Sequence, residues 1–285
     1  MQTFRTAAAR TLSYQVAGDG PLVVMLPGGP GLDPGACFAA SKLPGFRQLL
    51  FCPRGTGESD PPETPDGYRI EGYVSDLEEL RTHLNVPLLT LYGNSHGASI
   101  ALAYAEAYPG RVGRMVLANG PARMDAEFSA DVAVARERFV AAMPDGEERL
   151  ADAEAAGQLM RTTQDGNVRR QAFRTMMSRY VARLDDRGTA FLNQLCAAPM
   201  NFAAPGPMAA EMISGLDLLS AAKSVTVQTL VIAGELDVTV PAEHMEKIAE
   251  AMPNARFLSF DGVGHFVEVE AYDRWVEVVV NFLRS

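Results

Sequence analysis

Three residues whose side chains can cooperate in acyl transfer, Ser95, Asp237 and His265, lie far apart along this chain. A serine hydroxyl is a poor nucleophile at neutral pH. It needs a base with a pKa of about 7 and a group that orients this base and balances its charge. We expect His265 to be the base and Asp237 the orienting carboxylate. The order Ser, Asp, His is one that such triads adopt. The sequence therefore predicts nucleophilic catalysis by Ser95 through an acyl-enzyme intermediate.

Ser95 lies at the centre of a short turn, Gly93-Asn94-Ser95-His96-Gly97. The apolar residues 88–92 before it predict a buried strand, and the alanine-rich residues 98–107 after it predict a helix. So tight a turn requires a positive φ at its middle residue, and the flanking glycines remove the Cβ atoms that would collide there. This strand–turn–helix pattern is typical of a nucleophile elbow. The alternative is a serine that merely caps a helix.

The acid that orients His265 has alternatives. Glu235 and Glu268 also lie close to the predicted strand ends. Asn119 follows the strand after the elbow, but its amide carries no charge. Asp261 is too close along the chain to swing under His265. Asp237, just beyond the preceding strand, is therefore the predicted partner of the histidine.

Acyl transfer also needs two N–H groups that point at the developing oxyanion. We expect one from the backbone of His96, which follows the nucleophile at the start of the predicted helix. The second should come from the loop Pro27-Gly28-Gly29-Pro30-Gly31, whose prolines have no N–H to donate. Gly29 is the predicted donor. The alternative role of these glycines is simply to form a tight turn.

Composition limits the possible partners. With a formal net charge of −10 and no Lys/Arg cluster, the chain is not expected to bind nucleic acid or an anionic membrane surface. Residues 1–17 lack the apolar core of a signal peptide, and no stretch approaches the length of a transmembrane helix. Three distant cysteines, Cys37, Cys52 and Cys196, predict reduced thiols in a cytoplasmic protein. No metal-ligand spacing occurs, and we expect neither a metal nor a cofactor. The sequence does not predict the oligomeric state.

The elements that must position these residues alternate between strand and helix. After an opening hairpin at residues 3–16, short apolar runs predict strands at residues 22–26, 48–52, 88–92, 114–118, 228–233 and 256–260. Helical patterns lie between several of them and at residues 272–283. This alternation predicts an α/β fold with a mostly parallel sheet and right-handed crossovers. In such sheets functional groups gather at the carboxyl ends of the strands, where the loops described above begin.

Residues 122–221 interrupt this alternation. They show no strong strand signal, and helices are predicted at residues 125–142, 147–160, 167–184 and 189–196, followed by an irregular segment at residues 197–207. We therefore expect a core formed by residues 1–121 and 222–285 and an inserted helical cap at residues 122–221. The alternative is a second, independent domain.

Several motifs together resemble the α/β-hydrolase superfamily, and within it the branch of the proline iminopeptidases. These are Pro27-Gly28-Gly29-Pro30-Gly31, Cys52-Pro53-Arg54-Gly55-Thr56-Gly57-Glu58-Ser59, the turn around Ser95, the loop ending in Asp237, and Gly264-His265 followed by Glu270. The resemblance implies an α/β-hydrolase fold with a cap, and it places Gly29 and His96 at the oxyanion positions. Two residues differ from the pattern: Pro27 replaces a histidine and Cys52 an aspartate.

The predicted reaction is cleavage of a small-molecule carboxylic ester or small amide. The cap is expected to supply an apolar pocket, lined in part by its methionine-rich segments, which contain Met176, Met177, Met200, Met208 and Met212. For any one of these methionines, a place in the cap core is the favoured alternative. The resemblance also implies an alternative, an iminopeptidase-type aminopeptidase whose cap glutamates hold the substrate amine. Glu127, Glu137, Glu154 and Glu211 are candidates for that role by charge alone. A third possibility is a non-catalytic ligand-binding protein on the same fold.

Overall fold

A single mixed sheet forms the centre of the molecule. The structure is a computed structural model that describes the backbone of residues 1–285 and the side chains of residues 1–35 and 39–285. Its strands are β1 (Gln2–Arg5), β2 (Thr11–Ala17), β3 (Leu22–Leu26), β4 (Arg47–Cys52), β5 (Leu89–Asn94), β6 (Val112–Ala118), β7 (Gln228–Gly234) and β8 (Ala255–Phe260). They pair in the order β1-β2-β4-β3-β5-β6-β7-β8.

The sheet is antiparallel only at one edge. β2 pairs antiparallel with both β1 and β4, and the remaining neighbours pair parallel. The predicted α/β fold with an opening hairpin and a mostly parallel sheet is therefore confirmed. Because the strands β3 and β5 to β8 run the same way, their carboxyl ends meet at one side of the molecule.

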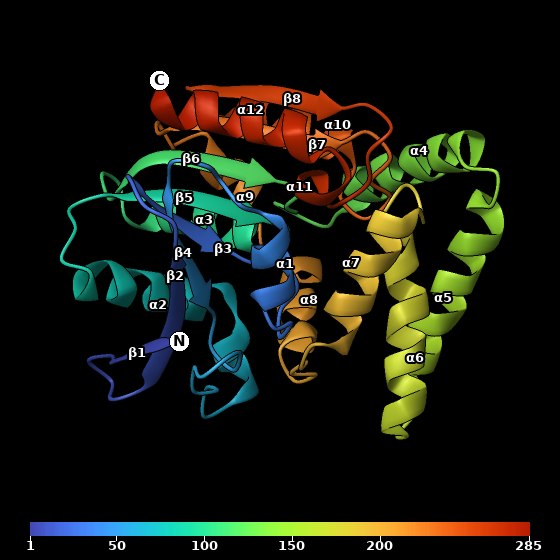
Figure 1. Ribbon diagram of the computed structural model, residues 1–285, viewed down its shortest axis with the longest axis horizontal. Helices are drawn as coiled ribbons and strands as arrows, with labels where there is room; N and C mark the ends of the chain where they lie inside the picture. The colour runs from blue at the N-terminus through green and yellow to red at the C-terminus, as the bar shows by residue number, and fades with distance from the viewer.

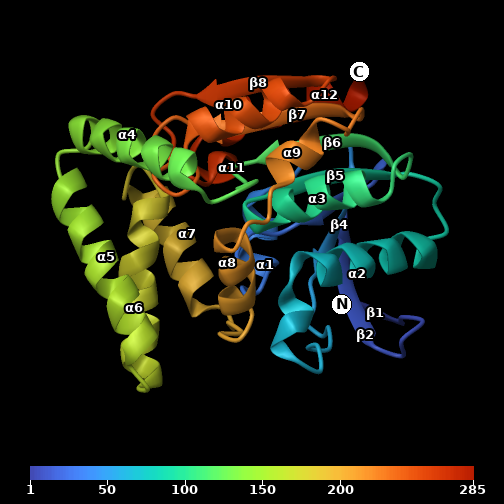
Figure 2. The ribbon, with the colours of Figure 1, turned by 180° about the vertical axis from the view of Figure 1, so that it is seen from behind.

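Helices cover both faces of the sheet. One face packs against α2 (Ile70–His83), α3 (His96–Ala107), α9 (Leu218–Ala222) and α10 (Ala242–Ala251), as seen from behind in Figure 2. The other face packs against α12 (Tyr272–Arg284), which lies in front of the sheet in Figure 1. Strand β3 shows how the two cores are filled: Val24 and Leu26 belong to the first, and Val23 and Met25 to the second. A strand covered on both faces must be apolar throughout.

The segment between β6 and β7 contains helices that extend beyond the carboxyl ends of the strands (Figure 1). They are α4 (Ala126–Ala142), α5 (Gly146–Thr162), α6 (Gly166–Met177), α7 (Asp186–Ala197) and α8 (Pro205–Ile213), with the 3-10 turn η2 (Ser178–Tyr180) after α6. We call this set of helices the cap. Its limits at residues 122 and 221 stay a prediction, and α9 of the same segment packs on α3 and α10.

Two predictions in the cap, one of a helix and one of an irregular segment, were wrong at their ends. The helix expected at residues 167–184 ends at Met177, because the carbonyl oxygen of Tyr180, at the end of η2, pairs with the core instead of continuing the helix. The segment at residues 197–207, expected to be irregular, includes the start of α8. Pro205 is at the first position of that helix, where the missing N–H has no cost.

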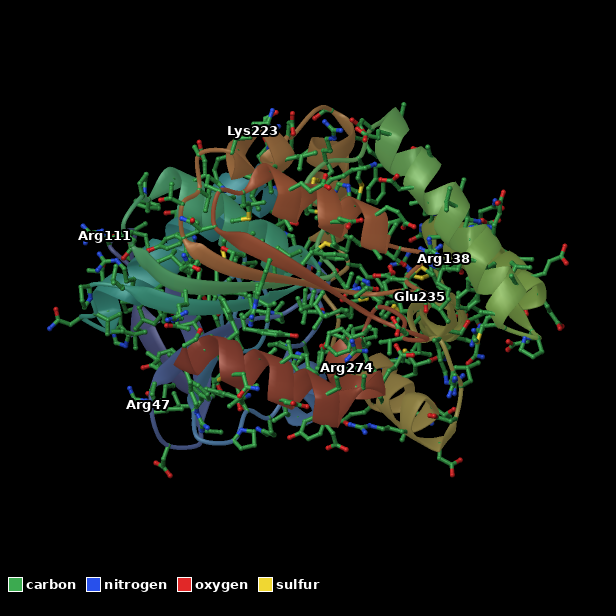
Figure 3. All side chains as sticks on the ribbon, turned by 90° about the horizontal axis from the view of Figure 1, so that it is seen from above. Arg47, Arg111, Arg138, Lys223, Glu235 and Arg274 are labelled. Carbon is green, nitrogen blue, oxygen red and sulfur yellow. The ribbon has the colours of Figure 1, made fainter. Side chains whose placement is uncertain are left out.

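Charged side chains join the cap to the core along one flank. The Lys247 ammonium of α10 lies 2.7 Å from the Asp131 carboxylate of α4. Arg138 of α4 donates to the carbonyl oxygen of Glu235, which follows β7, at 2.9 Å. Figure 3 shows Arg138 and Glu235 side by side, while the labelled Arg47, Arg111 and Lys223 lie at the periphery. α4 is therefore attached to the core through polar contacts.

Candidate active site

Ser95 occupies the strained turn that its sequence context predicts. It lies between β5 and α3 with φ 52° and ψ −121°, a conformation that side-chain-bearing residues rarely adopt. A Cβ atom on Gly93 would lie 2.4 Å from the carbonyl oxygen of Gly97, and one on Gly97 would lie 2.1 Å from the carbonyl oxygen of Leu26. Only glycine fits at these two positions. The turn therefore holds the Ser95 side chain at the amino end of α3.

His265 and Asp237 form a buried hydrogen-bonded pair. His265 Nδ1 lies 2.6 Å from Asp237 Oδ2, and both side chains are almost completely buried. Because an ionised carboxylate only accepts hydrogen bonds, Nδ1 carries the proton and donates it, which leaves Nε2 as an acceptor. This is the tautomer that a general base needs. The two predicted partners, 28 residues apart along the chain, are brought together.

Three further donors hold the Asp237 carboxylate in place. Its Oδ1 accepts the backbone N–H groups of Thr239 at 2.8 Å and Val240 at 3.1 Å. Its Oδ2 accepts the side-chain amide of Asn119 at 2.8 Å, in addition to the histidine. Together they fix the orientation of the carboxylate beneath the His265 ring. The supporting role of Asn119 was missed from sequence, although its place after β6 was noted.

None of the rival acids is hydrogen-bonded to the His265 ring among the described residues. Glu235 accepts the backbone N–H of Gly262 at 2.8 Å. Glu268 is fully buried, and burial raises its pKa to about 7. Asp261 is exposed at the end of the last strand. The carboxylate bonded to the His265 ring is that of Asp237.

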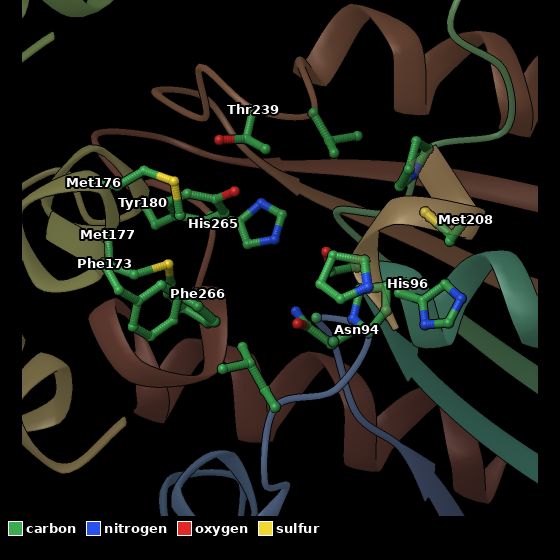
Figure 4. A pocket seen from close by; sticks show the side chains of 18 of the residues that line it. Asn94, His96, Phe173, Met176, Met177, Tyr180, Met208, Thr239, His265 and Phe266 are labelled. Carbon is green, nitrogen blue, oxygen red and sulfur yellow. The ribbon is translucent and has the colours of Figure 1, made fainter. Parts of the chain in front are cut away.

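Ser95 and His265 line the same cavity, which has a volume of about 230 Å³. No hydrogen bond joins the serine hydroxyl to the imidazole in the described part of the chain. Such bonds are often long before substrate binds. Figure 4 shows the His265 ring facing the centre of the cavity, with Asn94, the last residue of β5, on the other side. The roles assigned to these residues stay predictions.

The cavity is strongly apolar, and methionine is its commonest residue. The methionines are Met124, Met176, Met177, Met200 and Met208, most of them from the cap helices. Phe173, Tyr180 and Phe266 add aromatic surface on the side of His265 (Figure 4). Four of the methionines named from sequence therefore line the cavity. Met212 instead is buried without lining it.

The two predicted oxyanion donors line the same cavity as the nucleophile. His96 is the first residue of α3, so its backbone N–H has no helical partner. Gly29 has a positive φ of 66°, and both residues line the cavity. Gly28 lies so close to the elbow that a Cβ atom there would be 2.8 Å from the Ser95 Cβ. The glycine loop thus approaches Ser95 closely.

Two polar side chains beside Ser95 lack partners. Both amide atoms of Asn94 and Nε2 of His96 are buried without a hydrogen bond among the described residues. Burial lowers the pKa of His96 to about 3, so its ring is neutral at physiological pH. The ring packs edge-on against Tyr73 at 4.7 Å between centroids.

Cysteine and metal chemistry have little support from the described residues. Cys52 and Cys196 are free thiols, and burial raises the pKa of each to about 11, which disfavours the reactive thiolate. The side chain of Cys37 lies outside the described residues. Within the described side chains, no group of three His, Cys, Asp or Glu residues could hold a metal ion. None of the described helices has the length and apolar character required to cross a bilayer.

Known proteins resemble the chain over nearly its whole length. A 2-hydroxy-6-oxononadienedioate/2-hydroxy-6-oxononatrienedioate hydrolase of Paraburkholderia xenovorans (strain LB400) is 30% identical, covering 95% of this chain and 90% of that protein. A proline iminopeptidase of Heyndrickxia coagulans is 24% identical, with coverages of 94% and 92%. The solved structure of an esterase from Exiguobacterium antarcticum has a TM-score of 0.75 at 22% identity and 99% coverage of both chains. At that identity the likeness concerns the fold.

A family model described as the alpha/beta hydrolase fold matches residues 21–272. The match spans both halves of the sheet and the helices inserted between them, and the proline iminopeptidase is among the relatives, as the sequence motifs implied. The chain belongs to the α/β-hydrolase fold family.

Proposed function

We propose that this protein is a serine hydrolase that cleaves carboxylic esters with an uncharged, apolar acyl group. The observation that carries this proposal is the buried pair of His265 and Asp237 at a cavity whose wall includes Ser95 in its strained turn. A base in the required tautomer and a half-buried serine at a helix amino end are the two parts that acyl transfer needs.

In the proposed reaction, His265 Nε2 takes the hydroxyl proton of Ser95, and the Ser95 oxygen attacks the ester carbonyl. The Asp237 carboxylate stabilises the imidazolium that forms. The N–H groups of Gly29 and His96 stabilise the oxyanion, and each such donor contributes roughly 3 kcal/mol in other enzymes. His265 then protonates the departing alkoxide. A water molecule, deprotonated by the same ring, releases the acid and regenerates Ser95.

The cavity lining supports an uncharged substrate. None of its described residues is an Asp, Glu, Lys or Arg. An amine substrate should meet a carboxylate, and a dicarboxylate, as named for the relative from Paraburkholderia xenovorans, should meet a cation. The lining therefore favours an apolar ester over both.

The cap glutamates are occupied elsewhere, which weakens the aminopeptidase alternative. Glu127 pairs with Arg123 and Lys247, and Glu154 pairs with Arg136. Glu137 is exposed. Glu211 accepts the backbone N–H of Ile70 at 2.8 Å. None of the four lines the cavity described above.

The test compares a series of p-nitrophenyl acyl esters with a prolyl anilide, together with labelling by a fluorophosphonate. We expect ester turnover, little release of the anilide, and stoichiometric labelling that Ser95→Ala abolishes. Faster cleavage of the prolyl anilide would support an aminopeptidase. A folded protein that binds the esters but neither turns them over nor takes the label would be a ligand-binding protein.

A further inference from the structure

One short strip of the cap, Tyr180 to Ala182, runs directly along the loop that carries His265. The backbone N–H of His265 donates to the carbonyl oxygen of Tyr180 at 2.8 Å. Val181 has extended backbone angles, φ −112° and ψ 140°, and both Val181 and Ala182 are completely buried. The Tyr180 ring meets the His265 ring edge-on, with 5.0 Å between the ring centroids. The predicted base therefore touches the cap through both its backbone and its ring.

Glu270, in the short helix α11 (Val267–Glu270), connects the two segments. Its Oε2 accepts the N–H of Ala182 at 2.6 Å, and its Oε1 accepts the N–H of Gly264 at 3.0 Å. One carboxylate thus bridges the cap strip and the residue immediately before His265.

The approach of the two segments requires a glycine at position 264. A Cβ atom there would lie 2.7 Å from the nitrogen of Ala182 and 2.9 Å from both the Tyr180 carbonyl oxygen and Glu270 Oε1. The backbones are therefore in direct contact, without side chains between them. Any shift of the strip would change the surroundings of the His265 peptide group.

The cap holds the strip from the other side. Arg149 of α5 donates from Nη2 to the carbonyl oxygen of Ala182 at 2.7 Å. Its guanidinium lies over the Phe139 ring of α4, 4.6 Å from the centroid. The backbone of Ala182 is thus bonded to the cap through its C=O group and to Glu270 of the core through its N–H group.

We propose that Glu270 is a positioning residue for the reaction: it fixes the cap strip Tyr180–Ala182 against the loop of His265 and so sets the imidazole relative to Ser95. The inference rests on the proposed function. Tyr180 also lines the cavity, so the same bridge couples the shape of the substrate site to the placement of the base. Small displacements of catalytic groups are costly, since about 1 Å can reduce the rate by as much as ~100-fold.

The chain offers a matched control in Glu211. This buried carboxylate of α8 also bridges cap and core, because it accepts the N–H of Ile70 at 2.8 Å, but it does not line the cavity. Substituting Glu211 loosens a cap–core contact without touching the loop of His265. Comparing Glu270→Ala with Glu211→Ala therefore separates positioning of the base from general attachment of the cap.

The experiment measures kcat and KM on the best p-nitrophenyl ester, and the rate of fluorophosphonate labelling. We expect Glu270→Ala to lower kcat and the labelling rate by ~10-fold or more, with KM changed less than about threefold. Glu270→Gln keeps one acceptor oxygen and should recover part of the loss. Glu211→Ala should keep the kcat of the unmodified protein.

Equal losses of kcat in Glu270→Ala and Glu211→Ala, or no loss in either, would overturn the inference. If Glu270→Ala does not fold, the kcat values of Glu270→Gln and Gly264→Ala test the inference instead. The alanine at position 264 pushes the cap strip away from the loop of His265 without removing the Glu270 carboxylate. Unchanged kcat in folded forms of both would also overturn it. Failure of the proposed function has a different result: the unmodified protein itself would not be labelled by the fluorophosphonate.

Discussion

Ser95 combines the proposed chemistry with a measurable cost in stability. Its φ of 52° is one that a residue with a Cβ atom adopts only under strain, typically of about 1–3 kcal/mol, whereas glycine adopts it readily. We predict that Ser95→Gly abolishes ester turnover and raises the free energy of unfolding by about 1 kcal/mol. Ser95→Ala should abolish turnover without this gain, because alanine keeps the Cβ atom. Chemical denaturation of the three proteins tests this. Equal free energies of unfolding for Ser95→Gly and Ser95→Ala would contradict the proposal that the backbone at Ser95 is strained.

Single residues could be predicted from sequence where chemistry and spacing coincide. Ser95 stands out because two glycines flank it, and His265 because a Gly-x-Gly precedes it. The contribution of Asn119 could not be predicted: its amide reaches Asp237 across 118 positions of the chain, and nothing local marks that contact. The unpartnered amide of Asn94 was missed for a similar reason, since burial without a partner is a property of the folded site.

Among the elements, α8 should set how long an acyl chain the cavity accepts. Met208 of this helix lines the cavity, whereas Met212, one turn later, is buried elsewhere. Replacing either by alanine should cost roughly 2–5 kcal/mol of stability. Only Met208→Ala enlarges the cavity, so only this variant should shift the preferred p-nitrophenyl ester to a longer chain. An added buried methylene contributes about 0.8 kcal/mol, or roughly fourfold in kcat/KM.

The measurement is kcat/KM across esters of increasing acyl length for the unmodified protein and both variants. A shifted optimum in Met212→Ala, or none in Met208→Ala, would show that the acyl group does not lie against α8.

Strands were easier to predict than the ends of the cap helices. The strands β3, β5, β6 and β7 are buried on both faces and are therefore apolar runs. Such a run is visible in a short stretch of sequence. The end of α6 at Met177 has a long-range cause, because the following backbone pairs with the loop of His265. Local helix propensity continues past that point, so the sequence overestimates the helix. Elements whose limits are set by tertiary contacts are the ones that sequence patterns misplace.

For the whole molecule, buried titratable groups predict opposite stability trends at high and low pH. Burial raises the pKa of Glu268 to about 7 and of Glu270 to about 8, from 4.5. Between about pH 4.5 and 8 the folded protein therefore binds more protons at these sites than the unfolded chain, and its stability falls as pH rises. Burial lowers the pKa of His96 to about 3 and of His244 to about 4, from 6.5. At these two histidines the unfolded chain binds more protons than the folded protein, so stability falls as pH drops below about 6.5.

The two effects oppose each other between about pH 4.5 and 6.5, and only the glutamates act between about 6.5 and 8. We therefore predict that the free energy of unfolding, measured by urea denaturation, decreases from pH 6.5 to pH 8. Glu268→Gln should flatten this decrease, because an uncharged amide has no proton to lose and its side chain has nearly the same shape. The matched variant Glu79→Gln, at a surface carboxylate that accepts the N–H of Ala7, should leave the slope unchanged. A slope as steep in Glu268→Gln as in the unmodified protein would mean that Glu268 is already ionised at pH 6.5. The cost of burying its charge would then be offset within the fold at every pH in this range.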